Sequence, residues 1–508
     1  MKRNVFKYLT LLALCAASAH TKTVTNKTFF MPRSVHNNLA MEYSTWHSQI
    51  SKKEDRNWAG SVQATGFFQA STNKSNLGNY FGEFAENQDV LRDYISVVGE
   101  DLITGDPVPA RDPDGIESQY IFHHMQPVAV QPDIGGKIRF KPYQETYGLR
   151  FDYHQNIVKD FYFKASLPVV NVKNNISTSD IGEQRALIND PGAPYAGKNL
   201  YDYLKGNLAV TTADGAGYED NLQNALTHAK LDGKKDKAGV ADIDLAIGYN
   251  FWKKRGNHIG VYLDVTIPTG NSPKGEFLFE PICGNGQHWA FGGGLDTKFR
   301  LWNKKNDSIN LLVVADLKYL FQDTEKRTLS LLNDNGNKIN FGHYYLGGEK
   351  DAYPTFPLAN VLTQDLKIRP GLQFEGLVDL AFESTNLTFD IGYNIFSKEE
   401  ESVFLKNTWP TATYAIANPT FDTQIAFDPA TDYAAAMLIA GSIEQKHLDF
   451  DAVRHPRYTT HKIYGALGYA FNDWKFPLML GLGTSYEFTG GNAALENYAL
   501  WCKAGLSF

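Results

Sequence analysis

The chain ends in Leu500–Phe508, LWCKAGLSF, in which apolar and mostly polar residues alternate. In an extended strand, every second residue from Leu500 to Phe508 lies on one apolar face, and the residues between them lie on the other. A chain terminus is usually a polar, frayed segment that packs against nothing. A last strand with one apolar face and a terminal aromatic residue instead predicts a sheet whose outer side contacts lipid.

The same period-two alternation continues upstream, where Val261, Leu263 and Val265 alternate with Tyr262 and Asp264. We expect the first three side chains, with Ile267, to contact lipid, and Tyr262, Asp264 and Thr266 to face the interior of a barrel. Reading the whole chain in this way predicts fourteen strands, near 58–71, 118–127, 132–141, 145–155, 159–171, 239–252, 257–268, 287–302, 307–320, 366–382, 385–396, 460–472, 475–488 and 498–508. The second and third are interrupted by Pro127 and Pro132.

The gaps between these strands alternate between short and long. Counted back from the last strand, five gaps of one parity are short, whereas all gaps of the other parity except Pro142–Gln144 are long. Outer-membrane barrels have short periplasmic turns and long external loops. No apolar run reaches the ~20 residues of a membrane-spanning helix. The sequence therefore predicts an all-β, closed antiparallel transmembrane β-barrel of about 14 strands, within a range of 12–16, with long extracellular loops.

A soluble β-sandwich is the alternative fold, because its strands also have one apolar face. Strands of this length in hairpin order, with loops sorted by side, are unusual in a sandwich. Aromatic residues also recur at the strand ends, as at Trp252, Trp302 and Phe471, where a membrane barrel has its aromatic girdles.

The N-terminus predicts export. Lys2, Arg3 and Lys7 precede an apolar run and the small-residue pattern Ala17-Ser18-Ala19, which is typical of a cleaved signal peptide. A lipoprotein signal ending at Cys15 is disfavoured by the bulky Leu14. We therefore divide the chain into a signal peptide at 1–19, an N-terminal periplasmic extension or plug at 20–57, with a short helix at Leu39–Ile50, and a barrel at 58–508.

The signal peptide, the hairpin series and the last residue, Phe508, resemble a Gram-negative outer-membrane β-barrel. In this resemblance Phe508 is the assembly signal presented to the barrel-assembly machinery, and outer-membrane lipid is the other partner. Size and strand count are similar to the long-chain fatty-acid transporter family, and Ile267–Asn271 (IPTGN) is reminiscent of such porin-like barrels. The resemblance is one of architecture and covers about residues 58–508. It implies location in the outer membrane of a Gram-negative-type bacterium, and a homo-oligomer is compatible with it.

The inward positions carry balanced acidic and basic residues, which favours a wet interior, since charges are costly on a lipid-facing surface. A barrel of this size is too wide for its own side chains to fill. Three successive strands supply the candidates for a constriction in the lumen: Asp296, Lys298, Arg300, Asp316, Lys318, Lys367, Arg369, Glu375 and Asp379. They set ion preference in one interpretation. In the other they form salt bridges that stiffen the wall.

We therefore expect an outer-membrane pore that passes small polar solutes or ions through a charged, water-filled lumen. The first alternative is a transporter of hydrophobic compounds with an N-terminal plug and a lateral exit, and the second is a surface structural or adhesive barrel. For the apolar stretch Tyr433–Ile443 we favour a helix folded into the lumen.

The sequence indicates no enzyme, no cofactor, no catalytic residue and no metal site. His288 and His461 lie in no recognisable catalytic signature. Asp112–Glu117 and Asp334–Asn337 are incomplete calcium loops. Cys283 and Cys502 are expected to be free thiols. A net charge of −7 argues against nucleic acid as a partner.

Overall fold

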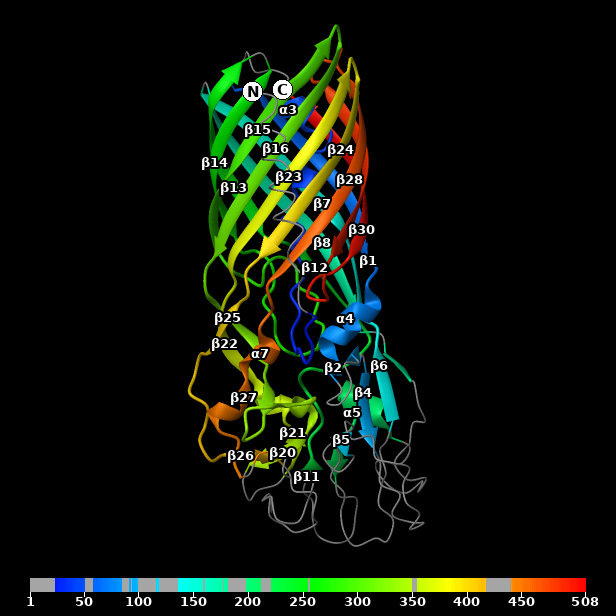
Figure 1. Ribbon diagram of the computed structural model, residues 1–508, viewed down its shortest axis with the longest axis vertical. Helices are drawn as coiled ribbons and strands as arrows, with labels where there is room; N and C mark the ends of the chain where they lie inside the picture. The colour runs from blue at the N-terminus through cyan, green and yellow to red at the C-terminus, as the bar shows by residue number, and fades with distance from the viewer. Residues whose placement is uncertain are drawn as a thin grey trace.

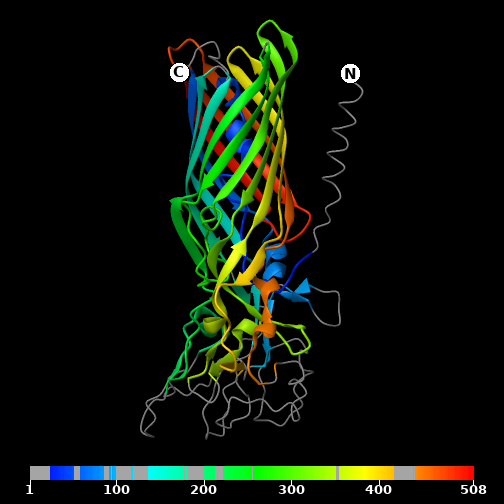
Figure 2. The ribbon, with the colours of Figure 1, turned by 90° about the vertical axis from the view of Figure 1, so that its left-hand side faces the viewer.

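The structure is a computed structural model. It describes residues 23–50, 58–84, 91–92, 94–98, 116–117, 136–158, 160–176, 178–180, 198–211, 221–254, 256–349, 354–416, 439 and 441–508. Twelve antiparallel strands form a closed barrel, which stands above a cap made by the long connections (Figures 1 and 2). The barrel strands are β1 (Gly60–Ser71), β7 (Tyr143–Val158), β8 (Phe161–Asn175), β13 (Ile243–Lys254), β14 (Asn257–Ile267), β15 (Ala290–Lys304), β16 (Asp307–Leu320), β23 (Gly371–Ser384), β24 (Leu387–Lys398), β28 (Tyr458–Phe471), β29 (Leu478–Thr489) and β30 (Asn497–Ser507). A further strand of the same sheet, β12 (Lys234–Val240), pairs with β8.

The barrel has twelve strands and not the fourteen expected, because β1 pairs directly with β7, from Gly60 opposite Gln155 to Ala70 opposite Glu145. No strand from the connection between β1 and β7 can therefore belong to the wall. The strand expected at 118–127 lies outside the described residues. The one expected at 132–141 appears as β6 (Gly136–Phe140), which pairs with β4 (Tyr94–Val98) and β9 (Thr178–Asp180) in a separate sheet. Its alternation is real, but Ile138 and Phe140 are fully buried in the cap and do not face lipid.

The predicted orientation of the strands is confirmed. Val261 and Leu263 are 45% and 62% exposed on the outside of β14, whereas Tyr262, Asp264 and Thr266 are buried on its inner side. β30 shows the same alternation along its whole length. Exposed Leu, Ile, Val and aromatic side chains recur on the outer face of all the barrel strands. Such a continuous apolar surface is stable in contact with lipid, which accords with an outer-membrane location.

The connections are sorted by length, as predicted. The turns β7–β8, β13–β14, β15–β16, β23–β24 and β28–β29 are short and lie at the end of the barrel where the C-terminus lies. The long connections leave the opposite end (Figure 1). The expected short gap at Pro142–Gln144 disappears, since β7 begins at Tyr143. That the cap is extracellular stays a prediction.

The long connections fold into a cap with its own apolar core. Its helices include α4 (Lys74–Phe81), α5 (Leu200–Lys205), α6 (Ala359–Leu362) and α7 (Phe450–Val453). Three small sheets join distant loops. The first consists of β17 (Asp323–Thr328), β22 (Thr363–Arg369) and β25 (Ser402–Leu405), and the second of β18 (Ser330–Leu332), β19 (Lys338–Ile339) and β27 (Leu448–Asp449). The third consists of β20 (Leu346–Glu349), β21 (Phe356–Pro357) and β26 (Tyr414–Ile416). Leu77, Tyr203 and Leu358 are fully buried in the shared core. No helix within the described ranges is long and apolar enough to cross a membrane.

The apolar stretch Tyr433–Ile443 lies mostly outside the described residues, and so does the helix expected there. Its described residues Ile439 and Ile443 are buried in the core of the cap, and Trp409 donates a hydrogen bond to the carbonyl oxygen of Ile443, at 2.7 Å. This part of the stretch is therefore in the cap and not in the lumen.

The N-terminal segment 23–50 enters at the cap and runs through the barrel. At the cap, the amide of Val24 donates to Asn492, and that of Asn26 donates to the carbonyl of Gly82. Deeper in the barrel lie α2 (Leu39–Tyr43) and α3 (His47–Ile50), in place of the single helix expected at Leu39–Ile50. The helix is interrupted at Thr45, which has a positive φ of 62° and donates its amide to Asp390 of the wall. A side chain of the barrel thus takes the amide that a continuous helix would use internally.

Candidate transport pathway: the filled lumen and a break in the wall

Arg33 of the N-terminal segment forms ion pairs with two strands of the barrel wall. Its guanidinium lies 2.6 Å from Glu375 of β23 and 2.8 Å from Glu487 of β29. All three side chains are nearly inaccessible to solvent. Lys462 of β28 adds a second cation to Glu487, at 3.1 Å. Because charge-assisted hydrogen bonds in a buried site are strong, these pairs hold the segment against the wall.

A second group of contacts lies around α2, on the other side of the lumen. Glu42 pairs with Arg150 of β7, at 2.7 Å, and Arg150 also pairs with Asp152, at 2.7 Å. The ammonium group of Lys164 on β8 donates to the hydroxyl of Tyr43, at 2.7 Å. The segment is therefore bound to both halves of the barrel.

The wall also pairs charges with itself. Lys318 lies 3.0 Å from Asp244 and 2.9 Å from Asp264, and the hydroxyl of Tyr262 donates to Asp316, at 2.9 Å. The two contacts of Lys318 are salt bridges between strands, as expected if the inward charges stiffen the wall.

The structure places six of the nine constriction candidates on the inner wall: Asp296, Lys298, Asp316, Lys318, Glu375 and Asp379. Asp296 accepts hydrogen bonds from His258 and Tyr43, both at 3.1 Å, and Lys298 pairs with Glu383, at 2.9 Å. They are spread around the lumen, and several contact the N-terminal segment. That they set ion preference stays a prediction.

The other three candidates do not line the lumen. Arg300 is exposed at the rim, beside the turn at Gly256. Lys367 and Arg369 are exposed on β22 of the cap. The sequence 366–382 reads as one strand, but Pro370 and Gly371, whose φ is +78°, separate β22 from β23. The prediction that Arg300, Lys367 and Arg369 belong to a constriction of the lumen is therefore wrong.

Little space remains between the segment and the wall. Two cavities of about 50 and 30 Å³ lie there, the first beside Glu42 and Lys318 and the second beside Tyr43 and His47. About 10–15 Å³ of such volume is enough for one water molecule, so the two cavities hold only a few waters. Within the described residues, the lumen is filled by the segment, in contrast to the open, water-filled lumen that we expected.

The wall has a break where β12 meets β13. β12 continues the pairing with β8 from Val240 opposite Val169 onwards. The pairing of β13 with β14 begins only at Ile243 opposite Ile267, and β14 does not pair with β12. The other edge of β12 therefore has no strand beside it within the described residues. A cavity of about 430 Å³ lies at this edge, lined by 237–240, 269–274, Cys283 and Gln287.

The β14–β15 connection, 268–289, lies at this break, and we call it the hatch loop. Asp242, fully buried between β12 and β13, accepts hydrogen bonds from the amides of Gly270, at 3.2 Å, and Asn285, at 2.6 Å. Glu280 accepts from four amides of the loop, those of residues 274–277. Burial raises the pKa of Glu280, although these amides favour its charged form.

The hatch loop also contacts the N-terminal segment. The side chains of Asn285 and His36 are hydrogen-bonded, at 3.1 Å, and His36 lies 3.9 Å from Asp242. Ile282 packs with Phe29 and Met31. A displacement of the segment would therefore remove contacts that hold the hatch loop in place.

Sequence reasoning missed Arg33 and His36, because both precede the first strand and no periodicity assigns them a face. A signal was present in the composition of the inner wall. Buried acidic residues such as Glu375 and Glu487 need cationic partners, and a plug is one place from which to supply them.

The sequence was also compared with known proteins. Residues 195–326, which include β12 and the hatch loop, match the model of a family described as "Putative MetA-pathway of phenol degradation". Comparison with curated proteins gives no significant match.

Among solved structures, the chain is similar to the COG4313 outer membrane channel from Pseudomonas putida F1, with 10% identity and a TM-score of 0.39 over 89% of this chain and 96% of that one. It is also similar to a Pseudomonas aeruginosa FadL homologue, with 8% identity and a TM-score of 0.26 over 94% and 98% of the two chains. The Ralstonia pickettii toluene transporter TbuX has 8% identity and a TM-score of 0.26, over 96% of both chains. The assignment of the fold of this chain rests on its own strand topology.

Proposed function

We propose that this barrel transports small hydrophobic compounds across the outer membrane, that residues 23–50 act as its plug, and that the solute leaves sideways through the break beside β12. The observation that supports this proposal is the cavity between the free edge of β12 and the hatch loop. It lies at the cap end of the wall, where β12 extends the sheet beyond the beginning of the β13–β14 pairing.

The filled lumen favours this route over a straight polar pore. A polar solute would have to displace a segment held by Arg33 and Glu42 through buried ion pairs. An apolar solute that moves from the cap through the break reaches the bilayer without crossing the charged interior, and its transfer from water into lipid is favourable. The family model that matches 195–326 takes its description from phenol degradation, which is consistent with an aromatic solute.

The hatch loop can be locked with a disulfide that uses a native cysteine. A Cβ atom at Gly239 would lie 4.0 Å from the sulfur of Cys283, so Gly239→Cys brings two thiols together across the break. Burial raises the pKa of the Cys283 thiol to about 11, so it is protonated at neutral pH and its oxidation needs a catalyst such as copper–phenanthroline. Cys502 is replaced by serine in this background to prevent other pairings.

Uptake of radiolabelled toluene by cells with the oxidised Gly239→Cys variant should fall by at least about tenfold, and reduction with dithiothreitol should restore it. The matched control is Gly239→Ser, which should transport normally after the same oxidation. Normal uptake by a variant whose cross-link is confirmed by mass spectrometry would contradict the lateral route.

A further inference from the structure

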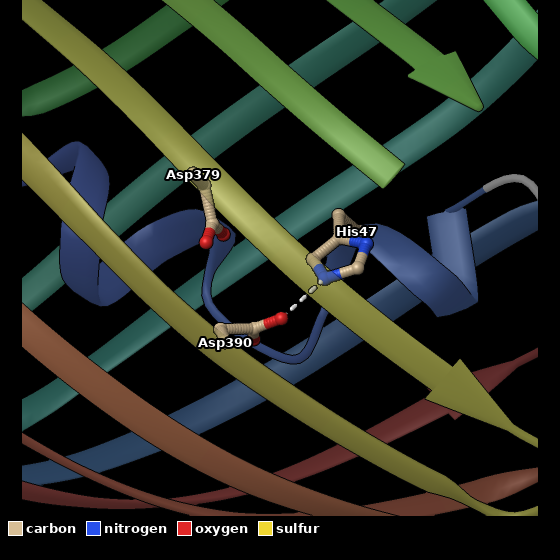
Figure 3. Close-up of side chains that lie close together, drawn as sticks. All are labelled: His47, Asp379 and Asp390. Atoms are coloured by element: carbon tan, nitrogen blue, oxygen red, sulfur yellow. Dashed lines mark hydrogen bonds and ion pairs between the residues drawn. The ribbon is translucent and has the colours of Figure 1, made fainter. Parts of the chain in front are cut away.

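Three side chains that are far apart in the sequence meet inside the barrel. His47 comes from α3, Asp379 from β23 and Asp390 from β24, and one ligand atom from each lies within 4.8 Å of the others. Figure 3 shows the carboxylate of Asp390 directed at the imidazole ring, with the side chain of Asp379 on the neighbouring strand. All three side chains are buried, with exposed fractions of 3%, 0% and 0%. The cluster thus joins the N-terminal segment to two strands of the wall.

Asp379 has no ion pair in this cluster. Within the described residues, neither of its oxygens has a well-formed hydrogen bond, and the groups that interact with it electrostatically include the hydroxyl of Tyr464, His47 and Lys503. An ionised carboxylate that is buried without a direct partner is unfavourable. A proton or a bound cation would therefore stabilise the carboxylate of Asp379.

His47 is oriented like a metal ligand. Its Nδ1 lies 3.3 Å from Glu383, whose carboxylate is held in turn by Lys298, at 2.9 Å. Nε2 lies 3.0 Å from Asp390, within hydrogen-bond distance. In the tautomer with its proton on Nδ1, this nitrogen has a lone pair available for a metal ion. A carboxylate on the far nitrogen is the usual support of a metal-binding histidine. Asp390 is itself oriented by the amide of Thr45.

We propose that Nε2 of His47 and the carboxylates of Asp379 and Asp390 bind a divalent cation. One imidazole and two carboxylates suit Zn²⁺ or Mn²⁺. His47 also lines a cavity of about 30 Å³, together with Lys298, which leaves room for water beside the ring. The bound ion neutralises Asp379 and ties α3 to β23 and β24. This inference does not depend on which solute is transported, because binding is measured without any solute.

The test uses the full chain without a histidine tag, purified in detergent, treated with a chelator, dialysed and titrated with Zn²⁺ and, separately, Mn²⁺ by calorimetry. We expect one equivalent of at least one of the two metals to bind. Asp379→Asn should weaken this binding by on the order of 100-fold, because it removes a ligand and its charge. The matched control is Asp316→Asn, a half-buried wall carboxylate outside the cluster, which should bind like the native chain.

A second variant and a second readout separate binding from folding. His47→Gln should also lose the site. The metal that binds should raise the melting temperature of the native chain and of Asp316→Asn, but not that of Asp379→Asn. Heat-modifiable electrophoresis shows whether each barrel is folded. Absence of stoichiometric binding of both metals to the native chain, or equal binding by Asp379→Asn and His47→Gln, would overturn the proposal and leave Asp379 protonated.

Discussion

At the scale of single residues, buried charge decides where the N-terminal segment lies. Arg33 is the clearest case, because it neutralises Glu375 and Glu487 on two different strands and its guanidinium also lies 4.6 Å from the ring of Phe396. The ion pairs of the inner wall were expected to be a property of the barrel alone. In the structure, Arg33 of the N-terminal segment supplies a cation that neutralises carboxylates of the wall.

Replacement of Arg33 should therefore destabilise the plugged state. Arg33→Ala leaves Glu375 buried without a cation, and removal of one partner of a buried ion pair costs about 3 to 5 kcal/mol. We expect residues 23–50 to become sensitive to added protease in intact, folded protein, as measured by mass spectrometry of the released peptides. Arg33→Lys, which keeps the charge, should be cut more slowly than Arg33→Ala. Full protection of the segment in Arg33→Ala would show that these ion pairs do not hold it.

At the scale of elements, the same alternating pattern serves two different environments. β14 and β6 both alternate apolar and polar residues, yet β14 turns its apolar face to lipid and β6 turns it to the cap core. The cap is therefore a packed unit, and it contains buried titratable groups. The 3₁₀ turn η2 (Gly342–Tyr344) carries one of them, His343, which packs against Tyr344.

The stability of the cap should fall in mild acid because of His343. Burial lowers its pKa to about 3, from an ordinary value near 6.5, so the folded cap keeps the ring neutral while the open state takes up a proton. The free energy of opening should decrease by roughly 1.4 kcal/mol per pH unit below pH 6.5 and level off near pH 3. Hydrogen exchange of the 330–345 region, corrected for intrinsic rates, measures this slope.

The glutamine side chain of His343→Gln is neutral at every pH. This variant should therefore reduce the slope by roughly 1.4 kcal/mol per pH unit. The control is His228→Gln on the outside of the cap, where the ring is hydrogen-bonded to Thr227. Burial lowers the pKa of His228 less than that of His343, so this variant should reduce the slope less than His343→Gln does. An unaltered slope in His343→Gln would place the acid sensitivity of the cap elsewhere.

At the scale of the whole molecule, the N-terminal segment connects the barrel wall with the cap. The segment 23–50 begins among the cap loops, where Val24 contacts Asn492, and ends at Ile50 near the short turns. It therefore runs along the length of the barrel interior. His36 links it to the hatch loop at Asn285. Movement of the segment and opening of the break should therefore be coupled.

Deletion of residues 23–50 should convert the barrel into a conducting pore. In planar bilayers, the native chain should show few or no ohmic steps, whereas the deletion variant should show steady steps, because its inner wall is polar and no longer filled. The signal peptide is kept, and heat-modifiable electrophoresis confirms that the shortened chain is folded. Equal, large conductance of both proteins would mean that the segment does not close the lumen, and would return the polar-pore interpretation.

The sequence by itself determined the barrel, the approximate positions of its strands, their lipid-facing sides and the sorting of turns by length, whereas the number of wall strands, twelve and not the fourteen predicted, was decided by the pairing of β1 with β7. The features that the sequence determined follow from period-two alternation, which is local and can be read from strands such as 257–267 without knowledge of their partners. The tertiary structure alone decided that the lumen is filled, that β12 leaves the wall open beside the hatch loop and that His47 meets Asp379 and Asp390. Such contacts join residues hundreds of positions apart, and no periodicity records them. Pro370 and Gly371 show the same limit on a smaller scale, since the alternation runs past them while the chain passes from cap to barrel.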